Sequence, residues 1–106
     1  MTQPEKIDYI INKGCEYFGL TPDDLLRKTG TRSNVHRMKR YIALIIIDHT
    51  ETTMAGVATT LGFWNKDSVS SAIKKIRDEL SDEFYGMNKT KIVYNELLKY
   101  LDYEKE

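Results

Sequence analysis

The sequence predicts an all-α domain, a compact bundle of five to six helices that includes a helix-turn-helix. Apolar residues recur at intervals of three and four along most of the chain, as in amphipathic helices. Glycine, proline and capping residues interrupt this pattern at points where helices would begin and end. A length of 106 residues suits one domain, residues 1–106, with a modest core.

The first two helices are marked by clear start and stop signals. Residues 4–18 carry apolar side chains at helical spacing, and Gly19 ends this run. Residues 21–24 read Thr-Pro-Asp-Asp, which provides an N-cap, a proline at the first helical position and acids in the first turn. We expect a short second helix there, with Leu25 and Leu26 facing the core.

A long central helix is predicted to follow a basic loop at residues 28–32. Ser33 or Asn34 can cap this helix, which runs to about His49. Residues 43–47 are apolar on nearly every side, and their β-branched side chains could also suggest a buried strand. We favour a helix, because an apolar stripe at helical spacing continues upstream and no second strand-like run exists to pair with it.

Residues 53–76 have the form of two helices joined by a tight turn at Gly62. Thr53 can cap the first helix, and the second, at about residues 65–80, has one apolar face and one polar, partly cationic face. Such a helix suits the major groove of DNA. The same pattern is common in all-α domains with other roles, so it leaves both interpretations open.

The C-terminal part of the chain supports an alternative function. We expect a turn region at residues 81–88, marked by Gly86, and a last helix at residues 89–102. This acidic, tyrosine-containing extension, residues 81–106, could dock on another subunit or partner. The alternative is therefore a helical protein-protein interaction module or a dimerising adaptor that does not bind DNA directly.

The charges are segregated along the chain, although the net charge is zero. Residues 27–77 contain ten Lys or Arg against three acids, a local charge of +7, and the other residues contain six against thirteen, which gives −7. Phosphate binding depends on where positive charge lies, and distant surface acids are partly screened. Neutrality is thus compatible with a basic DNA-binding face.

Composition and motifs argue against several other classes of protein. Cys15, His36 and His49 are the only candidates for nucleophile, base or metal ligand, so we expect no enzyme, no metal and no cofactor. No phosphate loop is present, which argues against a nucleotide ligand. A membrane span of about 18 apolar residues and a secretory signal are also missing, so we expect a cytoplasmic protein.

A set of landmarks then points to a known family. Tyr17 and Phe18 end a helix, residues 21–26 form an acidic capped segment that ends in two leucines, and residues 32–40 begin a long helix with arginines. A signature with matching positions follows at Gly62, Ser68, Val69, Ala72, Lys75 and Ile76. In this order and spacing, residues 11–80 resemble the C-terminal DNA-binding domain of the bacterial replication initiator DnaA.

The resemblance implies a Trp-repressor-like helical fold and sequence-specific binding of double-stranded DNA, with a role in replication or transcription control. It departs from the family at Phe63, where a second glycine is usual, and at residues 64–67, which replace the family's base-reading run. We therefore expect a target other than the DnaA box. Met38 also replaces a proline that commonly follows the family arginine at the position of Arg37.

The resemblance and the helix faces together select the candidate DNA contacts. Arg37 stands where the family places an arginine in the minor groove, and Asp67 could either accept from cytosine or stabilise the start of its helix. We expect Trp64 to be a core or turn-packing aromatic, in preference to a surface that stacks on the sugar-phosphate backbone. The predicted base-reading residues are Asn65, Lys66, Asp67, Ser70 and Arg37. The predicted backbone contacts are Lys28, Arg32, Lys39, Arg40, Ser68, Ser71 and Lys74.

Overall fold

The computed structural model describes residues 2–26, 34–81 and 89–101, and the regular elements in these ranges are all helices. This confirms the predicted all-α class. No described helix combines the length and apolar character needed to cross a membrane. The helices in chain order are α1 Gln3–Phe18, α2 Pro22–Leu26, α3 Asn34–His49, α4 Met54–Leu61, α5 Lys66–Ser81 and α6 Lys89–Leu101.

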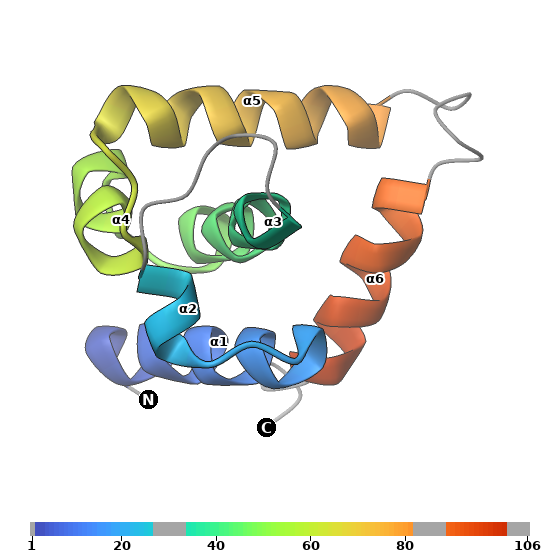
Figure 1. Ribbon diagram of the computed structural model, residues 1–106, viewed down its shortest axis with the longest axis horizontal. Coiled ribbons are helices and arrows are strands. Elements are labelled where there is room, and N and C mark those ends of the chain that lie inside the picture. The colour runs from blue at the N-terminus through green and yellow to red at the C-terminus, as the bar shows by residue number, and fades with distance from the viewer. Residues whose placement is uncertain (1, 27–33, 82–88, 102–106) are drawn as a thin grey trace.

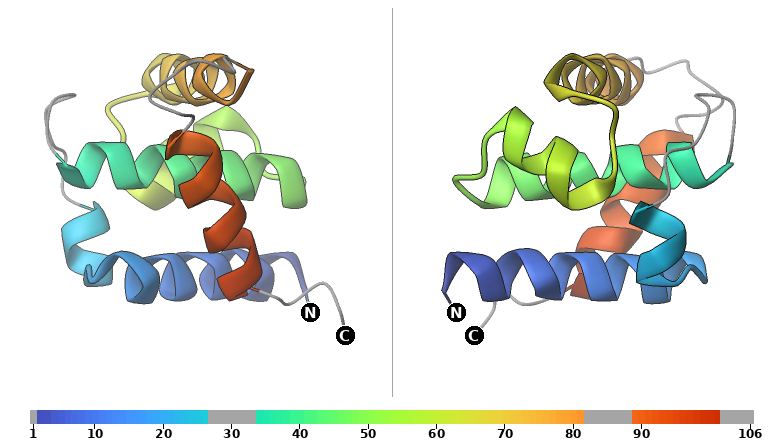
Figure 2. Two further views of the ribbon diagram at one scale, coloured as in Figure 1. Left: turned by 90° about the vertical axis from the view of Figure 1, so that its right-hand side faces the viewer. Right: turned by 60° about the vertical axis from the view of Figure 1, so that its left-hand side comes forward.

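The central element of the fold is α3, and the other helices pack around it. Helices α1 and α5 lie on opposite sides of α3 (Figure 1). Helix α6 connects the two sides of the bundle, because it contacts both α1 and α5 (Figure 2). The short helices α2 and α4 contact each other and α3, and α4 also packs against α5. This arrangement leaves the outer side of α5 at the surface.

Local capping interactions explain where the helices begin and end. The backbone N–H of Thr21 donates to Asp24 Oδ2 at 3.1 Å, and the backbone N–H of Asp24 donates to Thr21 Oγ1 at 3.2 Å. Thr53 Oγ1 accepts from the backbone N–H of Gly56 at 3.1 Å at the start of α4. Gly19 is the left-handed C-cap of α1. These contacts confirm the start and stop signals predicted for α1, α2 and α4.

The apolar run in α3 is helical, and it forms the centre of the core. Ile42, Leu44, Ile45 and Ile46 are at most 1% exposed, so this segment contacts neighbours on nearly every side. Helix α2 differs from the prediction, because Leu25 is buried whereas Leu26 is 49% exposed. Neighbouring residues on a helix point about 100° apart. A helix as short as α2 therefore cannot turn both leucines toward the core.

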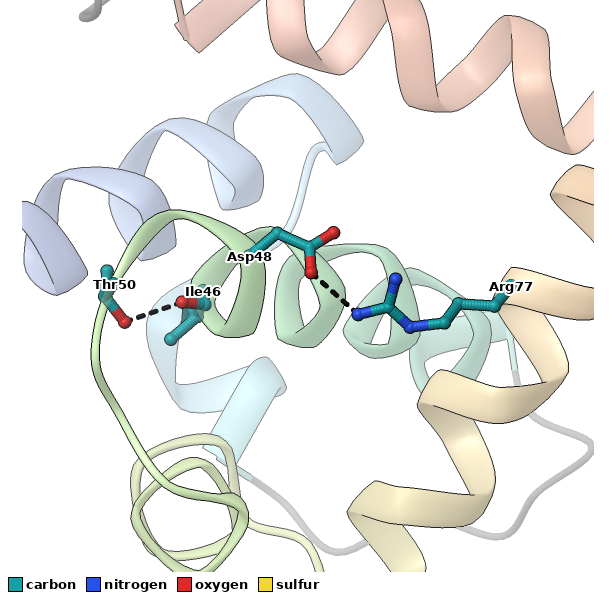
Figure 3. Close-up of polar contacts among 4 residues, drawn as sticks. All are labelled: Ile46, Asp48, Thr50 and Arg77. Carbon is teal, nitrogen blue, oxygen red and sulfur yellow. Dashed lines mark hydrogen bonds and ion pairs between the residues drawn. The ribbon is translucent and has the colours of Figure 1, made fainter.

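An ion pair connects α5 to the end of α3. Arg77 Nη2 lies 2.7 Å from Asp48 Oδ1 (Figure 3). Beyond Asp48, Thr50 Oγ1 donates to the carbonyl of Ile46 at 2.6 Å and closes the end of α3. Because the pair is partly exposed, it should stabilise the fold by only about 0–1 kcal/mol. It also means that Arg77, one of the ten basic residues in the segment 27–77, is neutralised by an acid of the same domain.

Helix α6 belongs to the core of the domain. Leu97 and Leu101 are buried, and Tyr9 Oη donates to the carbonyl of Leu101 at 2.6 Å. Tyr17 Oη donates to Glu96 Oε2 at 3.0 Å. The main apolar face of α6 is thus used within this chain, and only single large side chains such as Ile92 stay exposed on it. The predicted turn at Gly86 lies outside the described residues.

Candidate nucleic-acid interface

Helices α4 and α5 form a helix-turn-helix whose turn depends on Gly62. Gly62 has a φ of 70°, in the left-handed region, and acts as the C-cap of α4. The backbone N–H of Phe63 then donates to the carbonyl of Ala58 at 3.0 Å, and its ring is buried. The turn is therefore held by the backbone and by one inward-facing aromatic ring before α5 begins at Lys66.

Helix α5 has one face in the core and one in solvent. Its buried residues are Val69, Ala72, Ile73 and Ile76, in agreement with the predicted apolar stripe. The opposite side presents side chains that were predicted to contact DNA. These exposed residues are Lys66, Asp67, Ser70, Ser71 and Lys74, whereas Ser68 is half-buried.

Asn65 caps α5, as its sequence position predicted. Its Oδ1 accepts from the backbone N–H of Ser68 at 2.9 Å and from Ser68 Oγ at 3.3 Å. Bidentate recognition of adenine by asparagine requires both the amide oxygen and the amide nitrogen. Because the oxygen of Asn65 accepts the hydrogen bonds of the cap, bidentate recognition of adenine would have to break that cap. The side chains of Lys66 and Ser70, in contrast, are exposed.

The prediction that Trp64 packs in the core or against the turn is wrong. Trp64 is 68% exposed, and Phe63 beside it occupies the inward position at 5% exposure. The physical reason is the bent connection between α4 and α5, which turns one of the two adjacent rings inward and the other outward. The indole therefore stands at the surface directly before α5, where it can contact a ligand.

Two predicted phosphate contacts are buried, which corrects their placement on an open surface. Lys39 is 1% exposed and Arg40 5% exposed, because this side of α3 packs beneath the start of α5. Lys39 Nζ donates to the carbonyl of Gly62 at 3.4 Å and lies 5.7 Å from the centroid of the Phe63 ring. Lys28 and Arg32 lie outside the described residues.

Arg37 is exposed but belongs to another side of α3 than Lys39 and Arg40. It borders a hollow between α3 and α6 together with Tyr41 and Lys89. One turn of helix holds all three basic residues, yet successive side chains project in different directions. The structure thus brings Asp67 of α5 to the same hollow as Lys39 and Arg40, and it does not place Arg37 there.

A pocket of about 590 Å³ lies between α3 and the first half of α5. The sequence analysis did not identify it, although the spacing of positions 68, 71 and 75 marks a third face of α5, between the buried face and the outer face. The pocket itself depends on which side of α3 lies opposite this face of α5. The lining residues are His36, Lys39, Arg40, Gly62, Phe63, Trp64, Asn65, Asp67, Ser68, Ser71, Ala72 and Lys75.

Positive charge converges on His36 in this pocket. Partial burial lowers the pKa of the His36 imidazole, and the nearby cations Arg40, Lys39 and Lys75 lower that pKa further. Burial alone lowers the pKa of the Lys39 ammonium. Two cations from α3 and one from α5 therefore create a locally positive environment around His36, and Asp67 is the one acid among the described lining residues.

We expect stability to fall as the pH is lowered from about 7 to about 5, and the variant His36→Gln to show a shallower fall. The pKa of His36 in the folded protein lies below its ordinary value of 6.5, so the unfolded chain binds this proton more readily. Below that value, protonation therefore favours unfolding, and above it the contribution is absent. Urea unfolding of both proteins across this range measures the difference, and parallel pH profiles would contradict the assignment.

No group of three or more His, Cys, Asp or Glu able to hold a metal ion occurs within the described ranges. Comparison with protein-family models, curated proteins and solved structures finds no match to this chain.

Proposed function

We propose that this chain binds double-stranded DNA through α4 and α5, with the first half of α5 in the major groove. The observation that carries the proposal is the two-sided character of α5. One side is anchored in the core, and the other presents Lys66, Ser70 and Lys74 one helical turn apart, directly after a glycine turn. A helix-turn-helix places its second helix in the groove in this way, with its N-terminal residues at the base edges.

The resemblance to the DNA-binding domain of the DnaA family supports the same proposal. The positions that match the family include Val69, Ala72 and Ile76, which are among the residues that anchor α5 in the core. Of the positions that differ, Phe63 is buried, whereas residues 64–67 lie at the exposed start of the helix. We therefore propose a relative with a different target sequence, acting in the control of replication or transcription.

Individual side chains have distinct proposed roles at the DNA. Lys66 and Ser70 are exposed with polar ends that can reach base edges, and Lys74 follows one turn later to contact a phosphate. The exposed indole of Trp64 can stack against the sugar-phosphate backbone beside the groove. Asp67 lies in the first turn of α5, where a carboxylate stabilises the helix dipole.

Fluorescence anisotropy with labelled duplexes tests this function. Binding of random and DnaA-box duplexes should weaken steeply with salt, because each neutralised phosphate releases counterions. With about five phosphate contacts, the affinity should fall by more than about 100-fold between roughly 50 and 200 mM salt. Failure to bind any duplex at the lowest salt concentration would refute DNA binding.

Replacing Arg37 with alanine should weaken DNA binding by roughly 1–3 kcal/mol if this exposed arginine enters the minor groove. Lys91→Ala removes one positive charge from the exposed side of α6 and should leave the affinity nearly unchanged. Both affinities are measured by anisotropy at one salt concentration. Equal losses in the two variants would show that general charge, and not the position of Arg37, governs binding.

A further inference from the structure

We infer that the hollow between α3 and α6 binds an aromatic carboxylate, a ligand that joins a carboxylate group to a flat apolar ring. The hollow has a volume of about 540 Å³, within the range of roughly 300–1,000 Å³ that is usual for small-ligand sites. It is separate from the pocket beside the start of α5, because the two share no described lining residue. Its rim is cationic and its walls are apolar, and each matches one part of such a ligand.

Two exposed cations at the rim account for the carboxylate. Arg37 comes from the start of α3 and Lys89 from the start of α6, and no acid occurs among the described lining residues. Both side chains are exposed, and among the described residues neither takes part in a hydrogen bond or an ion pair. A ligand can therefore reach both charges without displacing a partner from the described helices. The guanidinium offers paired N–H donors that fit a planar carboxylate, and the ammonium adds a second positive charge.

The walls of the hollow account for the ring of the ligand. Phe18 from α1 and Tyr41 from α3 pack together with 5.9 Å between their ring centroids and 35° between their planes. Tyr41 is buried and forms the floor, whereas Phe18, Met38 and Val93 are half-buried, so part of each stays open to a ligand. Aromatic rings and a thioether both make favourable contacts with another aromatic ring. The walls therefore favour an aromatic body over a flexible aliphatic chain.

The polar groups at the floor of the hollow are already paired within the chain. Thr90 is buried, its Oγ1 donates to Glu79 Oε1 at 2.7 Å, and its side chain also hydrogen bonds to the Tyr41 hydroxyl. The carboxylate of Glu79 is not itself part of the lining. The floor thus requires no polar partner from a ligand, because its hydroxyl groups are satisfied. This directs the ring of the ligand to the floor and its anionic group to the rim, where Arg37 and Lys89 lie.

Isothermal titration calorimetry of the full chain, with no DNA present, tests this binding directly. We expect saturable binding of 2-naphthoate with a Kd of about 1 mM or tighter. The neutral 2-naphthamide, which keeps the rings, and acetate, which keeps only the carboxylate, should each bind at least about tenfold more weakly. The saturated analogue decahydro-2-naphthoate should bind at least about threefold more weakly, because it has no aromatic ring. Equal affinity for any of these three compounds, or no saturable binding of 2-naphthoate up to about 10 mM, would overturn the inference.

Charge-removing variants locate the ligand in the hollow. Arg37→Gln and Lys89→Gln should each weaken 2-naphthoate binding by at least about threefold, and the double variant by at least about tenfold. Lys99→Gln removes an exposed charge from the last turn of α6 and should keep wild-type affinity. All three side chains are exposed, so the variants should fold, and thermal unfolding measures whether they do. If the folded double variant binds as tightly as the Lys99→Gln control, the hollow is not the binding site.

Arg37 is also the predicted minor-groove contact, so the ligand should oppose DNA binding if the proposed function holds. A carboxylate bound at Arg37 occupies its guanidinium and places negative charge next to the DNA backbone. Saturating 2-naphthoate should therefore weaken duplex binding by at least about threefold, compared with the same concentration of sodium chloride. Unchanged duplex affinity would refute this coupling. The calorimetric titration contains no DNA, so it can succeed or fail independently of the DNA-binding proposal.

Discussion

Replacing Gly62 with alanine is expected to destabilise the fold by about 2–5 kcal/mol and to abolish duplex binding with it. Two physical effects add at this position. Gly62 has a φ of 70°, where an L side chain is strained by roughly 1–2 kcal/mol. A Cβ there would also overlap the carbonyl oxygen of Leu26 and lie 2.6 Å from its carbonyl carbon. Both obstacles are backbone atoms, so the turn or α2 has to move.

Gly19→Ala is the matched control for this prediction. Gly19 has nearly the same conformation, with a φ of 72°, but no atom outside its chain neighbours lies within 4 Å of the added Cβ. This variant therefore measures the conformational strain alone, and we expect a loss of roughly 1–2 kcal/mol. Urea unfolding of both variants gives the difference. Equal destabilisation would mean that the close approach of Leu26 to the turn does not contribute to the loss of stability in Gly62→Ala.

Truncating Leu97 to alanine should destabilise the protein by about 2–5 kcal/mol, the usual cost of a cavity at a buried leucine. Leu97 is fully buried, and it lies in the C-terminal extension that the resemblance to the DnaA family does not cover. A large loss would show that α6 is an integral part of this domain in solution. Urea unfolding monitored by circular dichroism measures it.

Ile92→Ala provides the comparison within the same helix. Ile92 is 53% exposed, so its truncation should cost less than about 1 kcal/mol. The pair also tests the alternative function of the C-terminal helix. If Leu97→Ala were as mild as Ile92→Ala, the apolar face of α6 would not be bound to this core, and an intermolecular role for that face would gain support.

The positions of the helices followed from local physical chemistry. Caps such as Thr21 and Thr53, and the left-handed glycines, act on the first or last turn of their own helices. Their effect is therefore readable in four or five neighbouring residues. The apolar run at residues 43–47 was also predicted correctly as helix, because its periodicity continues upstream within the same element.

Predictions that depended on packing between helices were less accurate. Leu26 and Trp64 are large apolar residues that remain exposed, and Lys39 and Arg40 are cations that became buried. Hydrophobicity gives the average preference of a residue type for the core. Whether a particular side chain is buried depends on which element packs against it. Long basic side chains have apolar stems that can be covered by a neighbouring helix, which makes their position hard to predict.

The sequence by itself determined the all-α class, the helix boundaries and the two-sided character of α5, because these depend on contacts and periodicity within single elements. Only the tertiary structure decided that α3 lies under the start of α5 and that their side chains enclose a cationic pocket with two aromatic residues. The physical reason is that this pocket joins residues 36–40 to residues 62–75. The packing of the whole core decides how these two segments lie against each other, and the sequence pattern of a single helix does not contain that information.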